Sequence, residues 1–228
     1  MRMIGFYDYT VVLTYISFAS AITGIFCASS GHLRWAVFFL AFSGLCDMFD
    51  GKIARTKKNR TEDEKSFGIQ IDSLCDVVCF GVFPIIICYK LGMHHPGSLI
   101  LLIFYGLAGM IRLGYFNVME AKRQNETDEA RKYYQGLPIT SMAIALPLLF
   151  VVSPLLHSPL AFQIILHLLV AGVGMLFIIN FRLRKLSTKE LIILVAVIAA
   201  AVLIILFAWQ SWWKFVRSLS IVSPVSGS

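Results

Sequence analysis

The chain has 228 residues, of which 58% are hydrophobic and 14% are charged, and its mean hydropathy is +0.77. A soluble domain carries roughly a quarter charged residues, so this composition excludes an ordinary soluble protein. The net charge of +7 needs no nucleic acid as a partner, because membrane topology and attraction to anionic lipid headgroups account for it. No cleavable signal peptide is apparent. We expect an all-α integral membrane protein, with a single domain over residues 1–228.

Apolar runs follow one another along the chain and indicate a polytopic bundle of about six to eight transmembrane helices, since a helix needs about 20 apolar residues to cross a bilayer. The expected spans are 10–29, 33–54, 69–92, 97–118, 136–155, 160–181 and 190–210. The third begins at an acidic motif, and the fifth is short and interrupted by Pro147 and Pro154. From about residue 155 onward the chain consists of hydrophobic helices alone.

Basic residues set the expected orientation. Most of the 20 lysines and arginines fall on one alternating set of connecting segments, and such residues accumulate on the cytoplasmic side. Two charged segments, 57–65 and 120–132, lie on that side and are expected as solvated loops. The sequence therefore predicts a protein integral to the cell membrane, with the acidic motif facing the cytoplasm.

Four aspartates border two of the apolar runs, in the stretches CDMFDGKIAR and GIQIDSLCD. Asp47 and Asp50 are three apart, and Asp72 and Asp76 are four apart, so each pair shares one face of a helix. A carboxylate within a membrane helix costs about 2.5–3.5 kcal/mol on insertion scales, so four of them require compensation. Two antiparallel helices joined by a short loop would bring both pairs into one pocket.

Divalent metal is the compensation that these residues favour. Clustered carboxylates repel one another, and Arg55 can neutralise only one of them, so a salt-bridged helix pair is a poor alternative. Oxygen ligands without His or Cys favour Mg²⁺ or Mn²⁺, and two such cations would balance four aspartates and leave positions for a phosphate-bearing substrate. Gly51 would allow close approach of a ligand, and the Arg55 fork could reach a phosphate.

Cysteine and histidine offer no better site. The five cysteines lie within expected spans without a CxxC pair, so we expect buried thiols, including Cys75 and Cys79 on one helix face. His32, His94 and His95 fall in far-side loops, and a histidine base beside the aspartates is not expected.

The spacing of the residues around the four aspartates resembles the signature motif of a known family. The pattern Asp47-x2-Asp50-Gly51-x2-Ala54-Arg55, followed by Gly68-x3-Asp72-x3-Asp76, resembles the signature of the CDP-alcohol phosphatidyltransferases at 47–76. The resemblance implies a membrane enzyme that displaces CMP from a CDP-linked lipid and uses two divalent cations, Mg²⁺ or Mn²⁺. It implies the following roles: Asp47, Asp50, Asp72 and Asp76 as metal ligands, Asp76 also as the catalytic base, and Asp47, Gly51, Arg55 and Gly68 as CDP-lipid contacts. The interval from Arg55 to Gly68 is longer than is usual in the family, and we expect a surface loop to absorb the extra residues.

The acceptor is indicated by shorter segments. Ser73 follows the third aspartate, and the segments RLGYFN, from Arg112 to Asn117, and GLP at 136–138 resemble the RLxxFN and GLP segments of phosphatidylserine synthases. This resemblance implies CDP-diacylglycerol and L-serine as substrates, phosphatidylserine and CMP as products, contact with membrane lipid, and a homodimer. Arg112 lies near the end of its expected span and can extend toward the pocket, so Arg112 and Asn117 are the expected acceptor-binding residues.

Two alternatives remain open. The acceptor could instead be glycerol 3-phosphate or inositol phosphate, which would call for further basic residues facing the pocket. From another class of protein, the aspartates could be the transport site of a divalent-cation transporter. A transporter would call for acidic or polar residues along the whole path, and the outer halves of the expected spans contain no aspartate or glutamate.

Overall fold

The computed structural model describes residues 5–7, 9–54, 56–57, 59–126, 133–156, 158–184, 190, 193, 196–200 and 203, with the backbone alone at 123–126 and 133–135. The expected seventh span, 190–210, falls largely outside the described residues, as does Arg55.

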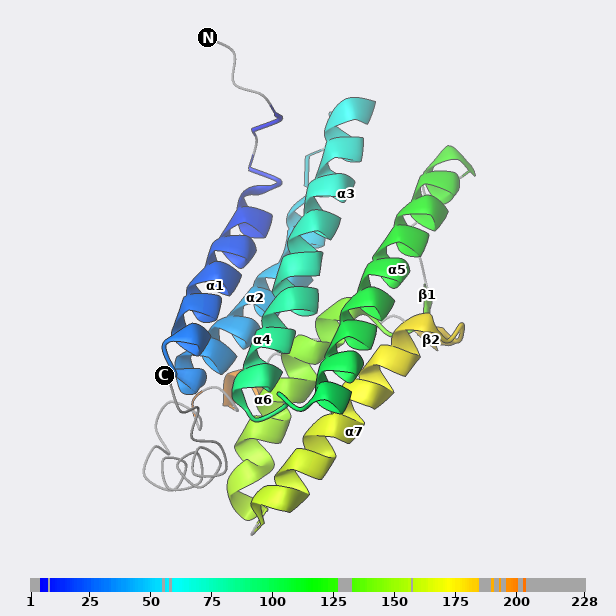
Figure 1. Ribbon diagram of the computed structural model, residues 1–228. Coiled ribbons are helices and arrows are strands. Elements are labelled where there is room, and N and C mark those ends of the chain that lie inside the picture. The colour runs from blue at the N-terminus through cyan, green and yellow to red at the C-terminus, as the bar shows by residue number, and fades with distance from the viewer. Residues whose placement is uncertain are drawn as a thin grey trace.

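The described part of the chain is a bundle of helices whose long members run side by side (Figure 1). The α-helices are α1 (Val12–Ser29), α2 (Leu33–Ala54), α3 (Glu62–Asp76), α4 (Phe83–Lys90), α5 (Pro96–Glu126), α6 (Met142–Val152) and α7 (Pro159–Ile178). Helices α1 and α2 begin and end within two residues of the first two expected spans, and the all-α class is confirmed.

Small residues let these helices approach closely, as is common between membrane helices. A side chain at Gly44 of α2 would place its Cβ 2.6 Å from the Cβ of Ala143 in α6. A side chain at Gly24 of α1 would collide with the ring of Phe83 at the start of α4. The core between the helices is filled by large apolar residues, among them Phe80, Tyr105 and Phe150.

The third expected span is part of a longer continuous helix. It comprises α3, a π-helix over Val77–Val82, and α4. The helix begins at Glu62, several residues before the expected start, so residues 62–65 are helical and the prediction of a solvated loop over 57–65 was wrong for that part. The cause is a capping box: Thr61 Oγ1 accepts from the Glu64 backbone N–H, and the Glu64 carboxylate accepts from the Thr61 backbone N–H.

The second charged segment is also partly helical. α5 continues to Glu126, past the end of the apolar run at 118, so the prediction of a loop over 120–132 was wrong for residues 120–126. Outside the apolar layer, the end of a helix is determined by capping residues and by helix propensity. Because the preceding turns of α5 are already formed, adding further residues to the helix is easier than starting a new one. Both α3 and α5 therefore extend beyond their apolar runs at the same end of the bundle (Figure 1).

The fifth and sixth expected spans are shorter than predicted and are joined by a small ribbon. α6 is flanked by 3₁₀ turns at Ile139–Ser141 and Ser153–Leu155, and α7 ends at Ile178. Strands β1 (Tyr133–Gln135) and β2 (Arg182–Arg184) pair antiparallel, with Tyr134 opposite Leu183. The ribbon ties the segment before α6 to the end of α7.

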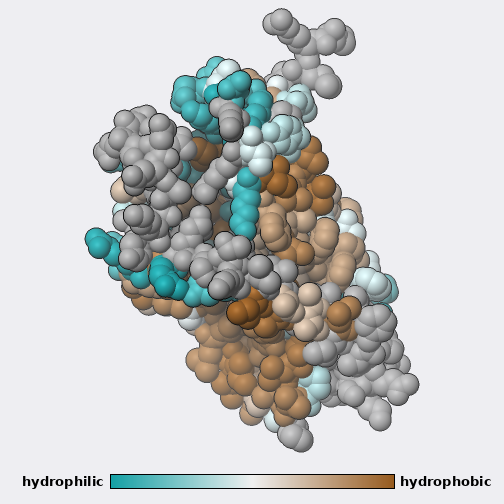
Figure 2. Space-filling view, turned by 180° about the vertical axis from the view of Figure 1, so that it is seen from behind, coloured by the Kyte–Doolittle hydropathy of each residue, from teal (hydrophilic) through white to brown (hydrophobic). Residues whose placement is uncertain are grey.

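The outer surface is apolar along the body of the bundle. Among the described residues, four helices are long and apolar enough to cross a membrane: Val12–Ser29, Glu62–Lys90, Pro96–Lys122 and Pro159–Ile178. A shorter apolar helix covers Ile139–Leu155, and α2, despite its 22 residues, carries Asp47, Asp50 and Lys52 near its end. Hydrophobic residues dominate the lower body in Figure 2, and hydrophilic residues gather toward the other end. These features are those of an all-helical membrane protein.

Candidate metal centre

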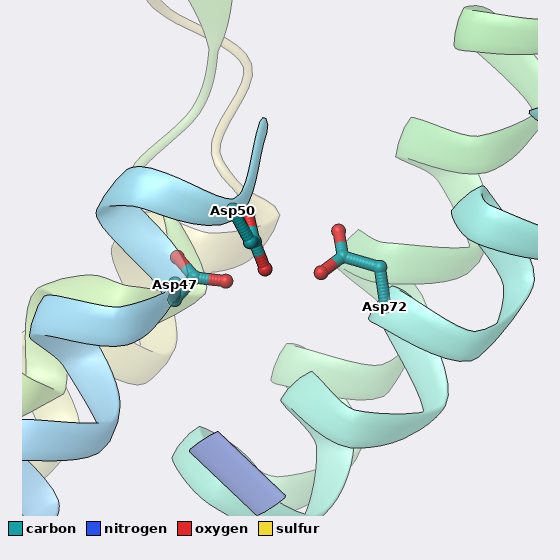
Figure 3. A group of neighbouring side chains, drawn as sticks. All are labelled: Asp47, Asp50 and Asp72. Atoms are coloured by element: carbon teal, nitrogen blue, oxygen red, sulfur yellow. The ribbon is translucent and has the colours of Figure 1, made fainter. Parts of the chain in front are cut away.

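Three of the aspartates meet where the end of α2 faces α3. One carboxylate oxygen each of Asp47, Asp50 and Asp72 lies within 4.8 Å of the others. The three side chains point toward one another across the gap between the two helices (Figure 3). The helical spacing of the aspartates and the antiparallel helices thus produce the cluster that the sequence predicts.

Asp76, one turn beyond Asp72, completes the group from within the bundle. Its carboxylate lies beside that of Asp47. Asp50 and Asp76 are each 8% exposed, whereas Asp47 and Asp72 are partly exposed. The cluster therefore has an inner, buried part and an outer part that a ligand can reach.

Two donors from the described residues reach Asp50. The Thr14 hydroxyl of α1 donates to Asp50 Oδ2 at 3.3 Å, and the Gly51 backbone N–H also donates to the Asp50 carboxylate. Asp72 Oδ1 is buried and has no hydrogen-bond partner among the described residues. Two like unit charges about 4 Å apart repel by about 4 kcal/mol at an effective dielectric constant near 20. These two donors do not offset several such pairs, so bound cations would stabilise the ionised cluster.

The donor set fits hard divalent cations. All of the clustered ligand atoms are carboxylate oxygens, which Mg²⁺ and Mn²⁺ prefer, and the orphaned Asp72 Oδ1 offers one more coordinating atom. The space beside the cluster is also open, because a Cβ built on Gly51 would meet no atom within 4 Å. Gly51 is exposed, so the helix surface is accessible there.

The second signature glycine has a different neighbour. A Cβ at Gly68 would lie 2.6 Å from Arg60 Nη2, so the Arg60 guanidinium covers this glycine. Arg60 comes from the lengthened interval between the two halves of the signature, and its Nη2 donates to the Glu64 backbone carbonyl at 3.0 Å. The structure therefore adds a cation beside Gly68 that sequence reasoning missed.

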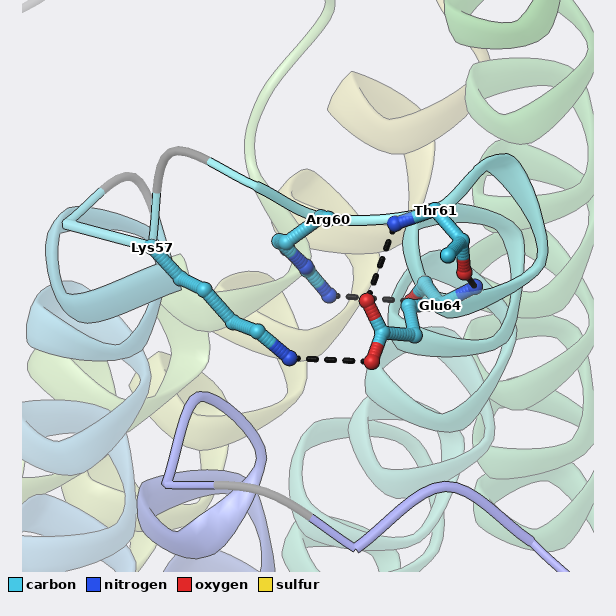
Figure 4. A network of polar contacts seen from close by, with 4 residues as sticks. All are labelled: Lys57, Arg60, Thr61 and Glu64. Atoms are coloured by element: carbon cyan, nitrogen blue, oxygen red, sulfur yellow. Dashed lines mark hydrogen bonds and ion pairs between the residues drawn. The ribbon is translucent and has the colours of Figure 1, made fainter.

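A small polar network fixes this interval at the start of α3 (Figure 4). Lys57 Nζ donates to Glu64 Oε1 at 2.9 Å, and the other Glu64 oxygen accepts from the Thr61 backbone N–H. The sequence signal that could have revealed it is the Thr61-x-x-Glu64 capping pattern, which identifies a helix start before the apolar run.

Thr14 is a second residue that the sequence reading missed. Its signal is the spacing of Thr14, Ser17 and Ser20, which places three hydroxyls on one face of an apolar helix. All three are buried, and Ser17 bonds to Ser43 of α2 with 2.7 Å between the hydroxyl oxygens. A hydroxyl stripe in a membrane helix indicates a polar partner on a neighbouring helix.

The expected acceptor residues lie on α5, which packs against α3. The Ser73 hydroxyl donates to Asn117 Oδ1 at 2.9 Å, so Asn117 stands level with the residue that follows Asp72. Arg112 is five residues earlier, which is about 7.5 Å deeper along the helix axis. It is 8% exposed, and its guanidinium lies over the Phe116 ring at 6.0 Å.

The expected burial of the cysteines is confirmed for Cys46, Cys75, Cys79 and Cys88, whereas Cys27 is half-buried. All five cysteines are free, and Cys75 and Cys79 are buried with their sulfur atoms 3.4 Å apart. Cys75 Sγ donates to the Thr14 backbone carbonyl at 3.4 Å, which holds α1 against the helix that carries Asp72 and Asp76.

Comparison with known proteins agrees with this geometry. A family model described as CDP-alcohol phosphatidyltransferase matches residues 9–176. The CDP-diacylglycerol–serine O-phosphatidyltransferase of Saccharomyces cerevisiae is 30% identical over 158 residues, which cover 67% of this chain and 56% of the relative. The protein of the same name from Helicobacter pylori is 32% identical over 123 residues, covering 53% of this chain and 47% of the relative.

An archaeal relative shares the same region. The archaetidylserine synthase of Methanothermobacter thermautotrophicus is 31% identical over 141 residues, covering 59% of this chain and 54% of the relative. The chain thus spans about half the length of the curated relatives that it matches.

Proposed function

The chain belongs to the CDP-alcohol phosphatidyltransferase family, and we propose that it transfers the phosphatidyl group of CDP-diacylglycerol to L-serine. The products would be phosphatidylserine and CMP. The observation that carries the proposal is the meeting of Asp47, Asp50 and Asp72 within 4.8 Å at the signature spacing. The serine acceptor is supported by the names of the relatives, whether their lipid is a diacylglycerol or an archaeal one.

In this proposal Asp47, Asp50, Asp72 and Asp76 hold two divalent cations, Mg²⁺ or Mn²⁺. When bound, such cations neutralise charge on the diphosphate and on the departing CMP. The aspartates would determine where the cations, and through them the diphosphate, are held, because α2 and α3 carry them to one place. The burial of Asp50 and Asp76 supports this role, since water cannot screen their charge there.

Asp76 is the proposed base. The serine hydroxyl oxygen would bond to the phosphorus next to diacylglycerol while the bond from that phosphorus to the CMP oxygen breaks. The hydroxyl proton would pass to the Asp76 carboxylate. Asp76 suits this task because it is buried and lies one turn further into the apolar run than Asp72, nearer the bilayer from which the CDP-lipid would enter. A general base of this kind contributes typically about 10²–10⁴-fold to the rate.

The substrate contacts follow from the surroundings of the cluster. The CDP-lipid is proposed to contact Asp47, Gly51 and Gly68, with Arg55, which lies outside the described residues, as a further phosphate contact. Open space at Gly51 supports this assignment. Arg112 and Asn117 are the proposed acceptor contacts. Asn117 is supported by its bond to Ser73, which follows Asp72 directly.

The setting of the enzyme is also part of the proposal. We place the site at the cytoplasmic face of the cell membrane, in line with the basic residues around the start of α3, and we propose that the chain acts as a homodimer. Membrane lipid would surround the apolar helices.

The experiment that tests this function supplies purified protein with CDP-diacylglycerol and Mn²⁺ or Mg²⁺. Serine, glycerol 3-phosphate and inositol phosphate are then offered separately, and CMP release is measured. Of the three acceptors, we expect only serine to support CMP release. A chelator should abolish this CMP release, and readdition of metal should restore it. Release with another acceptor would overturn the serine assignment. Metal flux into proteoliposomes without CMP release would instead indicate a transporter.

A further inference from the structure

A π-helical turn lies directly after Asp76, within the helix that carries half of the aspartate cluster. It spans Val77–Val82, and within it the Phe83 backbone N–H donates to the Val78 carbonyl, five residues back. A π turn accommodates an extra residue relative to an α-helix, and such turns occur frequently at functional sites. The sequence and the packing around this turn show what produces it.

Pro84 and Tyr105 are its chemical cause. In an unbroken α-helix the Phe80 carbonyl would accept from the N–H of residue 84, but Pro84 has none, and its ring would clash with that carbonyl. The Tyr105 hydroxyl of α5 donates to the Phe80 carbonyl instead, at 2.5 Å. Tyr105 is 1% exposed, and its ring packs on Phe177 of α7 with centroids 5.5 Å apart. The turn is thus held from a neighbouring helix.

The pattern of burial shows what the turn accomplishes. Apart from Gly81, the buried residues of Cys75–Cys88 fall in pairs that recur every four residues: Cys75 and Asp76, Cys79 and Phe80, Phe83 and Pro84, Ile87 and Cys88. In an α-helix each step of four residues overshoots a full turn by about 40°, so three steps accumulate about 120°. One residue corresponds to about 100°, so the extra residue in the π turn removes most of this drift.

We propose that Pro84 and Tyr105 are positioning residues for the aspartate cluster, acting through the π turn. With the turn present, the Asp72 and Asp76 side of α3 faces Asp47 and Asp50 while α4 keeps its apolar face in the core. Without it, one half of the helix would rotate by about 100° against the other, and because α4 is fixed by core packing, the aspartates would turn away. The inference rests on the proposed metal-dependent function, because it assigns the turn a role at that site.

The test separates stability from positioning by restoring the missing N–H. Tyr105→Phe removes the donor to the Phe80 carbonyl. The midpoint of thermal unfolding of this variant in detergent should therefore be lower than that of the wild type. The double variant Tyr105→Phe with Pro84→Ala supplies a backbone N–H for that carbonyl, so the midpoint should recover toward the wild-type value. The same double variant straightens the helix, so Mn²⁺ affinity should fall by at least about tenfold and CMP release by about a hundredfold.

The matched controls are Tyr89→Phe and Pro159→Ala. Tyr89 is largely exposed on α4, and Pro159 is the first residue of α7, where a missing N–H has no intrahelical role. Both should keep wild-type Mn²⁺ affinity.

Two outcomes would overturn the inference. Recovery of Mn²⁺ affinity and turnover together with stability in the double variant would leave the turn a purely structural role. Failure of the double variant to regain stability would show that the missing Pro84 N–H does not cause the turn. A wild-type protein that binds no Mn²⁺ and releases no CMP would instead overturn the proposed function, and the stability rescue would still decide the origin of the turn.

Discussion

The hydrogen-bonded network around His167 and the aspartate cluster treat their polar groups in opposite ways. Near the start of α5, Ser98 Oγ lies 2.8 Å from His167 Nε2 of α7, and His167 Nδ1 lies 2.7 Å from the Gln163 carbonyl. Because a carbonyl only accepts, Nδ1 donates to it, and in a neutral imidazole Nε2 then accepts from Ser98. The Gln163 amide in turn donates to the Leu91 carbonyl at 2.5 Å.

The network of Ser98, His167 and Gln163 also determines the backbone conformation at Gly92. Gly92 has φ +112°, and a Cβ there would lie 2.6 Å from Gln163 Nε2, so the glycine leaves room for the amide. Each of these polar groups has a partner within the protein, which is what a structural network requires.

The aspartate cluster is not fully paired in this way. Among the described residues, Asp72 Oδ1 has no hydrogen-bond partner, and the three converging carboxylates receive hydrogen bonds from the Thr14 hydroxyl and the Gly51 backbone. Buried groups that are left unpaired are costly, so they persist where a ligand completes them. The difference between the network and the cluster therefore separates polar residues that are paired within the fold from carboxylates that could hold a metal ion.

The largest expected effect comes from removing the orphaned carboxylate. Asp72→Asn should lower turnover at limiting metal by at least about a thousandfold, because several kcal/mol of charge stabilisation are lost and each 1.36 kcal/mol is tenfold in rate. CMP release and Mn²⁺ titration measure the effect. Asp63→Asn, on the exposed first turn of the same helix, is the matched control and should stay active. Wild-type activity of Asp72→Asn at limiting metal would contradict the metal site, and the same reasoning applies to Asp47→Asn and Asp50→Asn.

The next effect separates chemistry from binding within the cluster. Asp76→Asn should keep measurable affinity for CDP-diacylglycerol while turnover falls by at least about a hundredfold, because the group that takes the serine proton is lost. Lipid binding and single-turnover CMP release are compared on the same preparation. If both fall together, Asp76 only holds metal; if turnover survives, another group is the base.

A smaller effect is expected at the acceptor contact. Arg112→Lys replaces a planar, forked donor by a single ammonium, so the KM for serine should rise by about tenfold, more than the KM for CDP-diacylglycerol. The two KM values are obtained by varying each substrate at saturation of the other. An equal rise in both would indicate a packing role or a contact with lipid phosphate instead.

Hydropathy located the helices and helical spacing located the site, because both depend on residues close in sequence. The first two spans and the meeting of Asp47 and Asp50 with Asp72 follow from such local patterns. Helix ends in water are set by other forces, so the charged start of α3 at Glu62 was missed although Thr61 and Glu64 form a recognisable cap.

Features that depend on distant partners were harder to predict. The π turn is signalled by Pro84 and by the four-residue spacing of the pairs that follow Asp76, but its hydroxyl donor comes from Tyr105 on another helix. The pairing of β1 with β2 joins residues about fifty apart, and three-residue strands carry too little pattern to indicate a partner. Arg60 reaches Gly68 only because the capped helix turns the preceding interval back over it.

The smallest effect on activity should come from a change in the hydrogen-bonded network of Ser98, His167 and Gln163. Ser98→Ala leaves the half-buried His167 Nε2 without its Ser98 partner, and loss of such a hydrogen bond costs about 0.5–1.5 kcal/mol. The thermal midpoint in detergent should therefore fall, while the KM values and the Mn²⁺ dependence of the remaining folded enzyme stay as in the wild type. The measurement pairs a melting curve with turnover normalised to folded protein. Thr23→Ala is the matched control, because its hydroxyl donates to the Ala19 carbonyl of its own helix at an exposed position and its loss orphans no buried group. A shift in the Mn²⁺ dependence of Ser98→Ala would contradict the separation of this network from the proposed metal site. It would show that the two are coupled through α5, the helix that carries both Ser98 and Asn117.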